Sequence, residues 1–295
     1  MAGALRRIPT VLHEHANLTN TPWFQKIADR ALAPYTDIAL AVSKSTAEFV
    51  IGRRHIPPSK VKVVYLGVPL EEFMRERTSE EIGRARQELG IGPGEFAIGT
   101  VTRLHESKGN GYLLDAAARV LAERPSARFF LVGEGPLLSA LRAQASRLGL
   151  GDRFVFAGFR RDVAATLSAV DLTVFPSLWE GTPLTAFEAL AMGKPVVATD
   201  ADGLLDILTD GYDAAIVPKR NAAALADKIQ WAMDHPEERA RLSAAARNTG
   251  RQYDIGVFVR KMERLYTLLH EVSRPTRRRG LRHADLSFLA SGAQA

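Results

Sequence analysis

Short apolar runs alternate with helical patterns along residues 96–217, and this alternation constrains the fold more than any other feature of the chain. Runs such as Leu172–Phe175 are partly β-branched and end at a Pro/Ser break, which is typical of strands. Strands that alternate with helices form parallel sheets, so we predict a doubly wound α/β domain of about six strands. The expected strands are Phe96–Val101, Arg128–Val132, Phe154–Ala157, Leu172–Phe175, Val196–Thr199 and Ala214–Val217.

The start of the chain shows the same alternation over fewer units. Apolar runs at Pro9–His13, Ile38–Val42 and Val61–Tyr65 alternate with helical patterns at Trp23–Leu32 and Lys44–Arg54. The pattern gives about three strands, which is half of a doubly wound sheet and leaves one strand edge without a partner. We therefore expect an incomplete Rossmann-like N-terminal domain, which a partner chain could complete.

A Gly/Pro-rich joint at Gly90–Gly94 follows a charged helical stretch and marks the expected domain boundary. The last helical pattern carries Phe258, Met262 and Leu265 at helical spacing, so we expect it to pack back toward the N-terminal domain. The expected division is a partial N-terminal domain at 1–75, a linker at 76–94, a C-terminal domain at 95–255, a helix at 256–272 and a basic, disordered tail at 273–295.

Composition excludes several classes of protein. Cysteine is absent and the seven histidines are scattered, so we predict no disulfide and no structural metal. No apolar run approaches the roughly 20 residues of a membrane span, so a cytoplasmic protein is expected. Part of the net charge of +6 is a basic patch near the end of the chain. That patch could attract an anionic membrane or nucleic acid, but a solvated terminus is the simpler interpretation and we expect no nucleic-acid partner. Its arginines are Arg274, Arg277, Arg278, Arg279 and Arg282.

Residues 176–199 place two carboxylates, Glu180 and Glu188, across a loop-to-helix junction. Thr182 can cap the helix and Pro183 fits its first position. Glu180 then lies in a loop at the carboxyl end of a strand, where open parallel sheets bind ligands, and Glu188 lies about two turns into the helix.

Backbone N–H groups of the first helical turn, those of Leu184 and Thr185 among them, point toward the same crevice and favour an anion there. One loop can therefore offer donors to a phosphate and acceptors to hydroxyl groups. A helix-capping Glu180 and a solvated Glu188 are the alternative interpretation.

Arg103 and Lys108 follow the strand Phe96–Val101, so they also lie at the carboxyl end of a strand. A guanidinium forks onto phosphate oxygens and an ammonium adds compact charge, so this pair can neutralise a leaving diphosphate without a divalent ion. Two solvated surface cations are the alternative.

Other motifs are less specific. Gly133-Glu-Gly135 begins like a dinucleotide fingerprint, but Leu138 occupies the third glycine position, so NAD binding is not favoured. Gly133 still permits a close backbone approach, against which a nucleoside could lie. We interpret Asp200-Ala-Asp202 as a turn rather than a metal site. His13 and His15 lie at the end of the first predicted strand, and for His15 a structural and a substrate-contacting role are both open.

Together these motifs closely resemble the retaining glycosyltransferases of family 4, which have the GT-B fold of two Rossmann-like domains. The resemblance covers residues 8–270 and includes Arg103 to Gly109, Gly133 to Pro136, Phe156 to Gly158 and an E-x7-E signature from Glu180 to Glu188. It implies transfer of a sugar from a nucleotide diphosphate sugar, with retention at the anomeric carbon, without an obligatory metal and without a cofactor.

The resemblance also implies roles by position. Two departures from the family are the absence of its glycine-rich N-terminal loop and an aspartate, Asp206, where its GGxxE motif has glutamate. The implied roles are the diphosphate for Arg103 and Lys108, the ribose hydroxyls for Glu188, the donor sugar and phosphate for Glu180, Gly181, Thr182, Leu184 and Thr185, the base for the backbone around Phe159 with Gly133, and the acceptor side for His15.

The leading hypothesis is a glycosyltransferase for a cell-envelope polysaccharide or glycolipid, cytoplasmic and in peripheral contact with the inner face of the membrane. A donor-binding subunit that needs a partner chain is one alternative. A sugar-nucleotide epimerase of related fold is another, and it fits less well because the context of the E-x7-E signature resembles the transferases.

Overall fold

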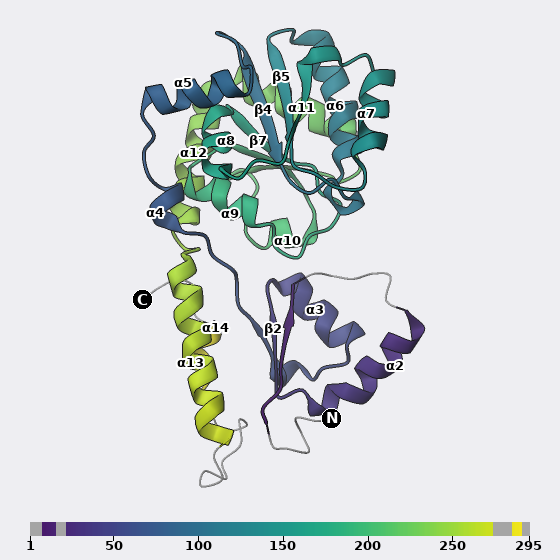
Figure 1. Ribbon diagram of the computed structural model, residues 1–295, viewed down its shortest axis with the longest axis vertical. Helices are drawn as coiled ribbons and strands as arrows, with labels where there is room; N and C mark the ends of the chain where they lie inside the picture. Colours follow the sequence, from purple (N-terminus) through teal and green to yellow (C-terminus); the bar gives the residue numbers. More distant parts are fainter. Residues whose placement is uncertain (1–7, 16–21, 274–284, 291–295) are drawn as a thin grey trace. The chain divides into compact units, whose positions relative to one another are not determined.

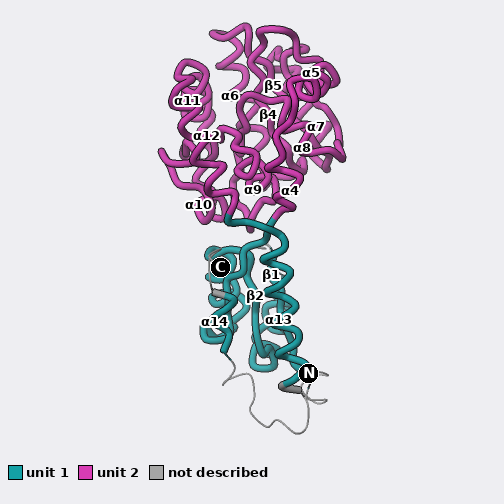
Figure 2. Tube along the Cα trace, turned by 90° about the vertical axis from the view of Figure 1, so that its left-hand side faces the viewer, with its two compact units in different colours: residues 1–67, 252–295 teal, residues 68–251 magenta. Residues whose placement is uncertain are grey.

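The computed structural model describes residues 8–15, 22–273 and 285–290. The chain divides into two compact units, unit 1 formed by residues 1–67 with 252–295 and unit 2 formed by residues 68–251 (Figure 2). Each unit contains one parallel β-sheet flanked by helices, which confirms the predicted α/β class. No helix in the described ranges is both long and apolar enough to cross a bilayer.

Unit 2 is built on a six-stranded parallel sheet of order β6-β5-β4-β7-β8-β9. The chain winds outward from β4 through β5 to β6 and then restarts at β7 on the other side of β4. This reversal places the topological switch point at the carboxyl ends of β4 and β7, where such sheets bind ligands. The strands are β4 (Phe96–Val101), β5 (Ala127–Val132), β6 (Phe154–Gly158), β7 (Leu172–Phe175), β8 (Val196–Thr199) and β9 (Ala215–Val217).

Helices cover both faces of this sheet, with α6, α7 and α11 on one side and α5, α8, α9 and α12 on the other (Figure 1). Side chains such as Phe129 and Leu113 fill the core between the sheet and the first group. The helices are α4 (Leu70–Phe73), α5 (Ser79–Glu88), α6 (Asn110–Glu123), α7 (Leu138–Arg147), α8 (Val163–Ala169), α9 (Leu184–Ala191), α10 (Asp202–Leu205), α11 (Ala222–Asp234) and α12 (Pro236–Gly250).

Unit 1 has a three-stranded parallel sheet of order β1-β2-β3. Its central strand is buried on both faces, with Leu40 packed against Leu265 of α13 and Ala39 against Val50 of α3. Within the described residues β1 pairs with β2 alone. The elements are β1 (Val11–Glu14), α2 (Trp23–Leu32), β2 (Ile38–Ala41), α3 (Lys44–Arg53), β3 (Val61–Val63), α13 (Ile255–Ser273) and α14 (Ser287–Ala290).

The structure corrects the expected linker at 76–94, because this segment contains α5 and belongs to unit 2. Helix α5 begins with a capping box between Thr78 and Glu81. Arg86 then joins it to the sheet, donating to the carbonyl oxygen of Ala169 at 3.0 Å and to the Asp171 carboxylate at 3.1 Å. These bonds span more than 80 residues of sequence, so no local pattern reveals them.

The boundaries of the units also differ from expectation by a few residues, since unit 2 begins at Val68 and ends at Arg251. Helix α13 is part of unit 1. The disordered tail expected from residue 273 is corrected in part, because Leu289 of α14 is buried in the core of unit 1. The tail arginines between 274 and 282 lie outside the described residues.

Candidate donor site at the carboxyl ends of β4 and β7

Two loops meet at the switch point of unit 2, one after β4 and one after β7. The Leu178 amide donates to the Ser107 carbonyl oxygen at 2.7 Å. Gly109 has a φ of +60°, and a Cβ there would lie 1.9 Å from the carbonyl oxygen of Pro176. Only glycine permits this approach, which fixes the position of the neighbouring Lys108.

Lys108 and Glu180 form a buried ion pair at this junction. The Lys108 Nζ lies 2.6 Å from both carboxylate oxygens of Glu180, and the two side chains are 13% and 7% exposed. The Ser177 hydroxyl also donates to Glu180 Oε1 at 2.7 Å. Glu180 is therefore no helix cap and Lys108 no solvated cation, which excludes that alternative interpretation for both residues.

Arg103 lies on the same loop as Lys108, directly after β4 and Thr102. Its side chain is exposed and makes no hydrogen bond or ion pair with any residue that the structure describes. An unpaired guanidinium beside a lysine that is held by a carboxylate gives the edge of the sheet positive charge, which suits a phosphate.

The glycines after β5 bring that loop against the loop after β4. Gly133 has a φ of +133°, and a Cβ there would lie 1.9 Å from the carbonyl oxygen of Thr102. A Cβ on Gly135 would lie 2.5 Å from the Leu104 carbonyl oxygen. The close approach expected from Gly133-Glu-Gly135 is thus made to a neighbouring loop, and contact with a nucleoside stays a prediction.

Phe159 follows β6 at the same edge of the sheet. Gly158 before it has a φ of +67°, and the Phe159 side chain is 65% exposed. A large apolar ring at a strand's carboxyl end offers a face to a planar ligand, since aromatic rings stack on such groups.

Helix α9 begins at Leu184, with Pro183 as its N-cap and no side-chain cap hydrogen bond. This corrects the predicted cap, because the Thr182 hydroxyl donates to the Gly181 carbonyl oxygen at 2.8 Å instead. The Leu184 and Thr185 amides open the helix at N1 and N2, where backbone N–H groups have no intrahelical acceptor and favour an anion.

Glu188 lies on α9 about one turn beyond these amides, rather than the expected two turns into the helix, and is half-buried. Its Oε2 is enclosed and has no hydrogen-bond partner among the described residues. Burial, and next the nearby carboxylate of Glu72 on α4, raise the pKa of Glu188 to about 7. The structure thus excludes a solvated Glu188 and leaves one enclosed carboxylate oxygen without a donor among the described residues.

The Asp200 and Asp202 side chains are engaged in the loop after β8. The Lys219 amide donates to Asp200 Oδ1 at 2.7 Å, and Lys219 Nζ lies 3.2 Å from Asp202 Oδ1. Gly203, in α10, packs so closely on the loop after β7 that a Cβ would lie 2.0 Å from the Gly181 carbonyl oxygen. These contacts fix the loop that carries Glu180.

His15 belongs to unit 1, whereas the other candidate residues belong to unit 2. It follows β1, is exposed, and stacks on His13 with 6.2 Å between ring centroids. The Tyr266 hydroxyl on α13 lies 3.0 Å from His13 Nε2. Burial, followed by the charge of His15, lowers the pKa of His13, so a neutral ring is favoured there.

Several residues around these sites were missed in the sequence. Ser177 stands three residues before Glu180, a spacing that could have indicated a side-chain contact. Glu72 and Tyr266 could not have been found, because their contacts with Glu188 and His13 join segments more than 100 residues apart.

Comparison with known proteins gives a consistent family. The family described as Glycosyl transferases group 1 matches residues 81–249, more than half of the chain, and the one described as Glycosyltransferase Family 4 matches residues 1–72. An uncharacterized glycosyltransferase of Methanocaldococcus jannaschii is 34% identical over 66% of this chain and 49% of its own length. The lipopolysaccharide core biosynthesis mannosyltransferase LpsB of Rhizobium meliloti is 31% identical over 72% of this chain and 59% of its own length. The chain therefore spans between about half and three-fifths of these relatives.

Solved structures show the same fold. Anabaena Alr3699/HepE in complex with UDP and glucose matches 90% of this chain and 73% of that chain, with a TM-score of 0.82 and 25% identity. A sucrose-phosphate synthase from Thermosynechococcus elongatus matches 89% of this chain and 68% of that chain, with a TM-score of 0.76 and 23% identity. With the family match over residues 81–249, the chain belongs to the glycosyl transferases group 1 family and has the GT-B fold.

Proposed function

We propose that the protein transfers a sugar from a nucleotide diphosphate sugar to a glycan or lipid-linked acceptor, with retention of anomeric configuration. The observation that carries this proposal is the buried Lys108–Glu180 pair at the switch point, with Nζ 2.6 Å from the carboxylate. The ammonium and the uncapped first turn of α9 can bind the diphosphate of such a donor, and the carboxylate can bind its sugar. A solved relative, Anabaena Alr3699/HepE, is described in complex with UDP and glucose.

In this proposal the diphosphate lies between the cations and the start of α9. Arg103 donates two hydrogen bonds to the phosphate oxygens, and the Leu184 and Thr185 amides donate to the same group. Lys108 donates to both the phosphate and Glu180. Glu180, still held by the Ser177 hydroxyl at 2.7 Å, accepts from a hydroxyl of the donor sugar.

The nucleoside lies along the other loops of the same edge. Glu188 accepts from the ribose hydroxyls through its carboxylate, of which one oxygen is enclosed and has no hydrogen-bond partner in the described structure. The base lies against Phe159 and the Gly133 loop, and Gly181 and Thr182 border the donor sugar.

The reaction breaks the bond between the anomeric carbon and a phosphate oxygen and forms a bond to an acceptor hydroxyl oxygen on the same face of the sugar. Negative charge develops on the departing diphosphate, which Arg103 and Lys108 stabilise, so the step does not require a divalent cation. The leaving phosphate oxygen takes the acceptor's proton. His15 serves the acceptor side.

The names of relatives suggest the class of acceptor. LpsB is named for lipopolysaccharide core biosynthesis, and an Escherichia coli relative, 26% identical over 74% of this chain and 58% of its own length, is named as a galactosyltransferase acting on a sugar-diphosphoundecaprenol. We accordingly propose that the acceptor is an envelope polysaccharide or a glycolipid. In this proposal the protein is cytoplasmic and binds the acceptor at the inner face of the membrane. A donor-binding subunit completed by a partner chain is the second candidate, favoured by the β1 edge, which pairs only with β2 among the described residues.

Donor hydrolysis followed by proton NMR tests the reaction, because water can replace an unidentified acceptor. UDP-glucose, GDP-mannose and ADP-glucose are each incubated with the purified chain in EDTA. We expect one donor to be cleaved and the α-anomer of the sugar to appear first, before mutarotation. Initial release of the β-anomer would contradict retention, and cleavage only after magnesium is added would contradict the metal-independent step. Donor binding without cleavage would favour the subunit.

A further inference from the structure

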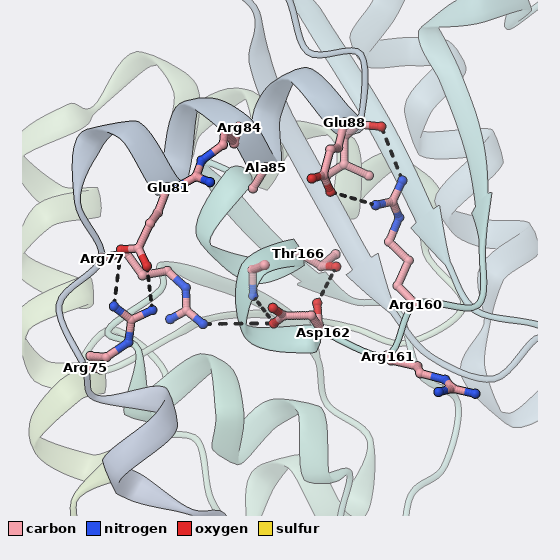
Figure 3. A pocket seen from close by; sticks show the side chains of 12 residues that line it. Arg75, Arg77, Glu81, Arg84, Ala85, Glu88, Arg160, Arg161, Asp162 and Thr166 are labelled. Carbon is pink, nitrogen blue, oxygen red and sulfur yellow. Dashed lines mark hydrogen bonds and ion pairs between the residues drawn. The ribbon is translucent and has the colours of Figure 1, made fainter.

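A pocket of about 420 Å³ lies in unit 2 between α5, α8 and the loop that joins β6 to α8 (Figure 3). None of the candidate donor-site residues lines it. Five arginines and three carboxylates line it, so positive charge is in excess. The arginines are Arg75, Arg77, Arg84, Arg160 and Arg161.

Arg77 is the most enclosed of these cations, with a side chain that is 9% exposed. Its Nη2 lies 4.0 Å from Asp162 Oδ1, which is beyond hydrogen-bond length. Its Nη1 is buried and has no hydrogen-bond partner among the residues that the structure describes. Asp162 Oδ1 also accepts from the Ala165 amide at 2.6 Å, so this carboxylate is occupied as a helix cap. A buried guanidinium with an unsatisfied donor favours an anion beside it.

Arg75 and Arg160 border the pocket in ion pairs with glutamates. Arg160 is held by Glu88, with 3.7 Å between guanidinium and carboxylate, and its guanidinium lies across the pocket from Arg77 (Figure 3). Arg75 donates to both carboxylate oxygens of Glu81, at 2.9 and 3.2 Å, and its side chain is half exposed. The Arg160–Glu88 contact is long, and Arg160 Nε has no hydrogen-bond partner among the described residues, whereas an arginine can bind a phosphate through two parallel hydrogen bonds. A multiply charged anion can therefore displace Glu88 from Arg160.

We propose that this pocket is a second anion site that binds a phosphoryl group, carried by a small molecule or by a lipid headgroup. Arg77 binds it at the base and Arg160 at the side. The site goes beyond the donor function, because it shares no residue with the donor site. Arg160 follows Phe159 directly, so an anion here would also hold the loop on which the proposed base-stacking ring lies.

Calorimetric titration with inorganic pyrophosphate separates this site from the donor site. We expect two sites in the wild-type chain. Arg77→Gln and Arg160→Gln should each weaken the pocket site at least tenfold and leave the donor site unchanged, whereas Lys108→Met should weaken only the donor site. Arg119→Gln, at an exposed position of α6, is the matched control and should keep both. Circular dichroism checks that every variant is folded. If Arg77→Gln does not fold, Arg160→Gln alone tests the pocket site.

The result separates the two proposals. A single site that depends on Arg77 but not on Lys108 would support this pocket and count against the donor site. Cosedimentation with phosphatidylcholine vesicles, with and without phosphatidylglycerol, identifies the source. Binding only to the vesicles that contain phosphatidylglycerol, and its loss in Arg160→Gln, would assign the site to a lipid headgroup. If the protein binds pyrophosphate but neither kind of vesicle, the site would be assigned to a small molecule. The proposal is overturned if folded Arg77→Gln and Arg160→Gln bind pyrophosphate and vesicles as the wild type does.

Discussion

Lys108→Met is expected to lower donor turnover by about 10³-fold, because it removes a preorganised cation from the oxygen on which charge develops. It should also destabilise the fold. Glu180 would remain 7% exposed without its counter-ion, and an uncompensated buried charge costs about 3–5 kcal/mol. Turnover is measured at saturating donor and the free energy of unfolding by urea denaturation.

A double variant separates catalysis from stability. Lys108→Met with Glu180→Gln removes both charges, so we expect it to regain most of the unfolding free energy while turnover stays at the level of the single variant. Lys228→Met on α11 is the matched control and should leave turnover unchanged. If Lys108→Met turned over donor normally, or if the double variant were no more stable than the single one, the role given to this pair would be incorrect.

Glu188→Gln is expected to weaken nucleotide binding about tenfold to a hundredfold and to stabilise the unliganded protein above pH 7. The pKa of Glu188 is about 7 in the folded chain against 4.5 for a free carboxyl group. Between these values the folded state binds the extra proton, so wild-type stability falls as pH rises through this window. The shift corresponds to up to about 3 kcal/mol, which glutamine does not lose because it carries no charge. Unfolding of both proteins at pH 4 and pH 8 measures the difference.

Ligand binding should show the same linkage from the other side. The ribose hydroxyls donate to the ionised carboxylate, so nucleotide affinity should rise as pH increases through 7 and binding near pH 7 should release a proton. Calorimetry in buffers of different ionisation enthalpy counts that proton. Equal pH dependence of unfolding for wild type and Glu188→Gln, or binding without proton release, would show that the pKa of Glu188 is not raised. Unchanged nucleotide affinity in Glu188→Gln would show that Glu188 does not bind the ribose.

Hydrophobic pattern predicted most of the fold because each strand of unit 2 is a local apolar run. Leu172–Phe175 and Phe96–Val101 appear in the structure with the expected bounds. The domain boundary was less predictable, since α5 belongs to unit 2 through bonds from Arg86 to residues more than 80 positions away. The predicted N-cap of α9 was wrong by one residue. Pro183 is the N-cap, and the Thr182 hydroxyl donates to the Gly181 carbonyl oxygen.

The candidate site was predictable in position but not in its internal contacts. Parallel strands bring their carboxyl ends to one edge, so Lys108 and Glu180 could be placed near each other from the order of elements alone. The sequence does not show that they form a buried pair across 72 residues, because this depends on the close approach of Gly109 to the loop after β7. The raised pKa of Glu188 depends on burial and on Glu72, which no sequence spacing expresses.

The central claim is that unit 2 binds a nucleoside diphosphate through cations and carboxylates at the ends of β4 and β7. Calorimetric titration of the whole chain with UDP, GDP and ADP in turn, with EDTA present, tests it most directly. We predict saturable one-to-one binding of one nucleotide, which is weakened in Lys108→Met and in Glu188→Gln. Absence of binding by all three nucleotides to the folded chain, or binding that both variants retain undiminished, would contradict the account.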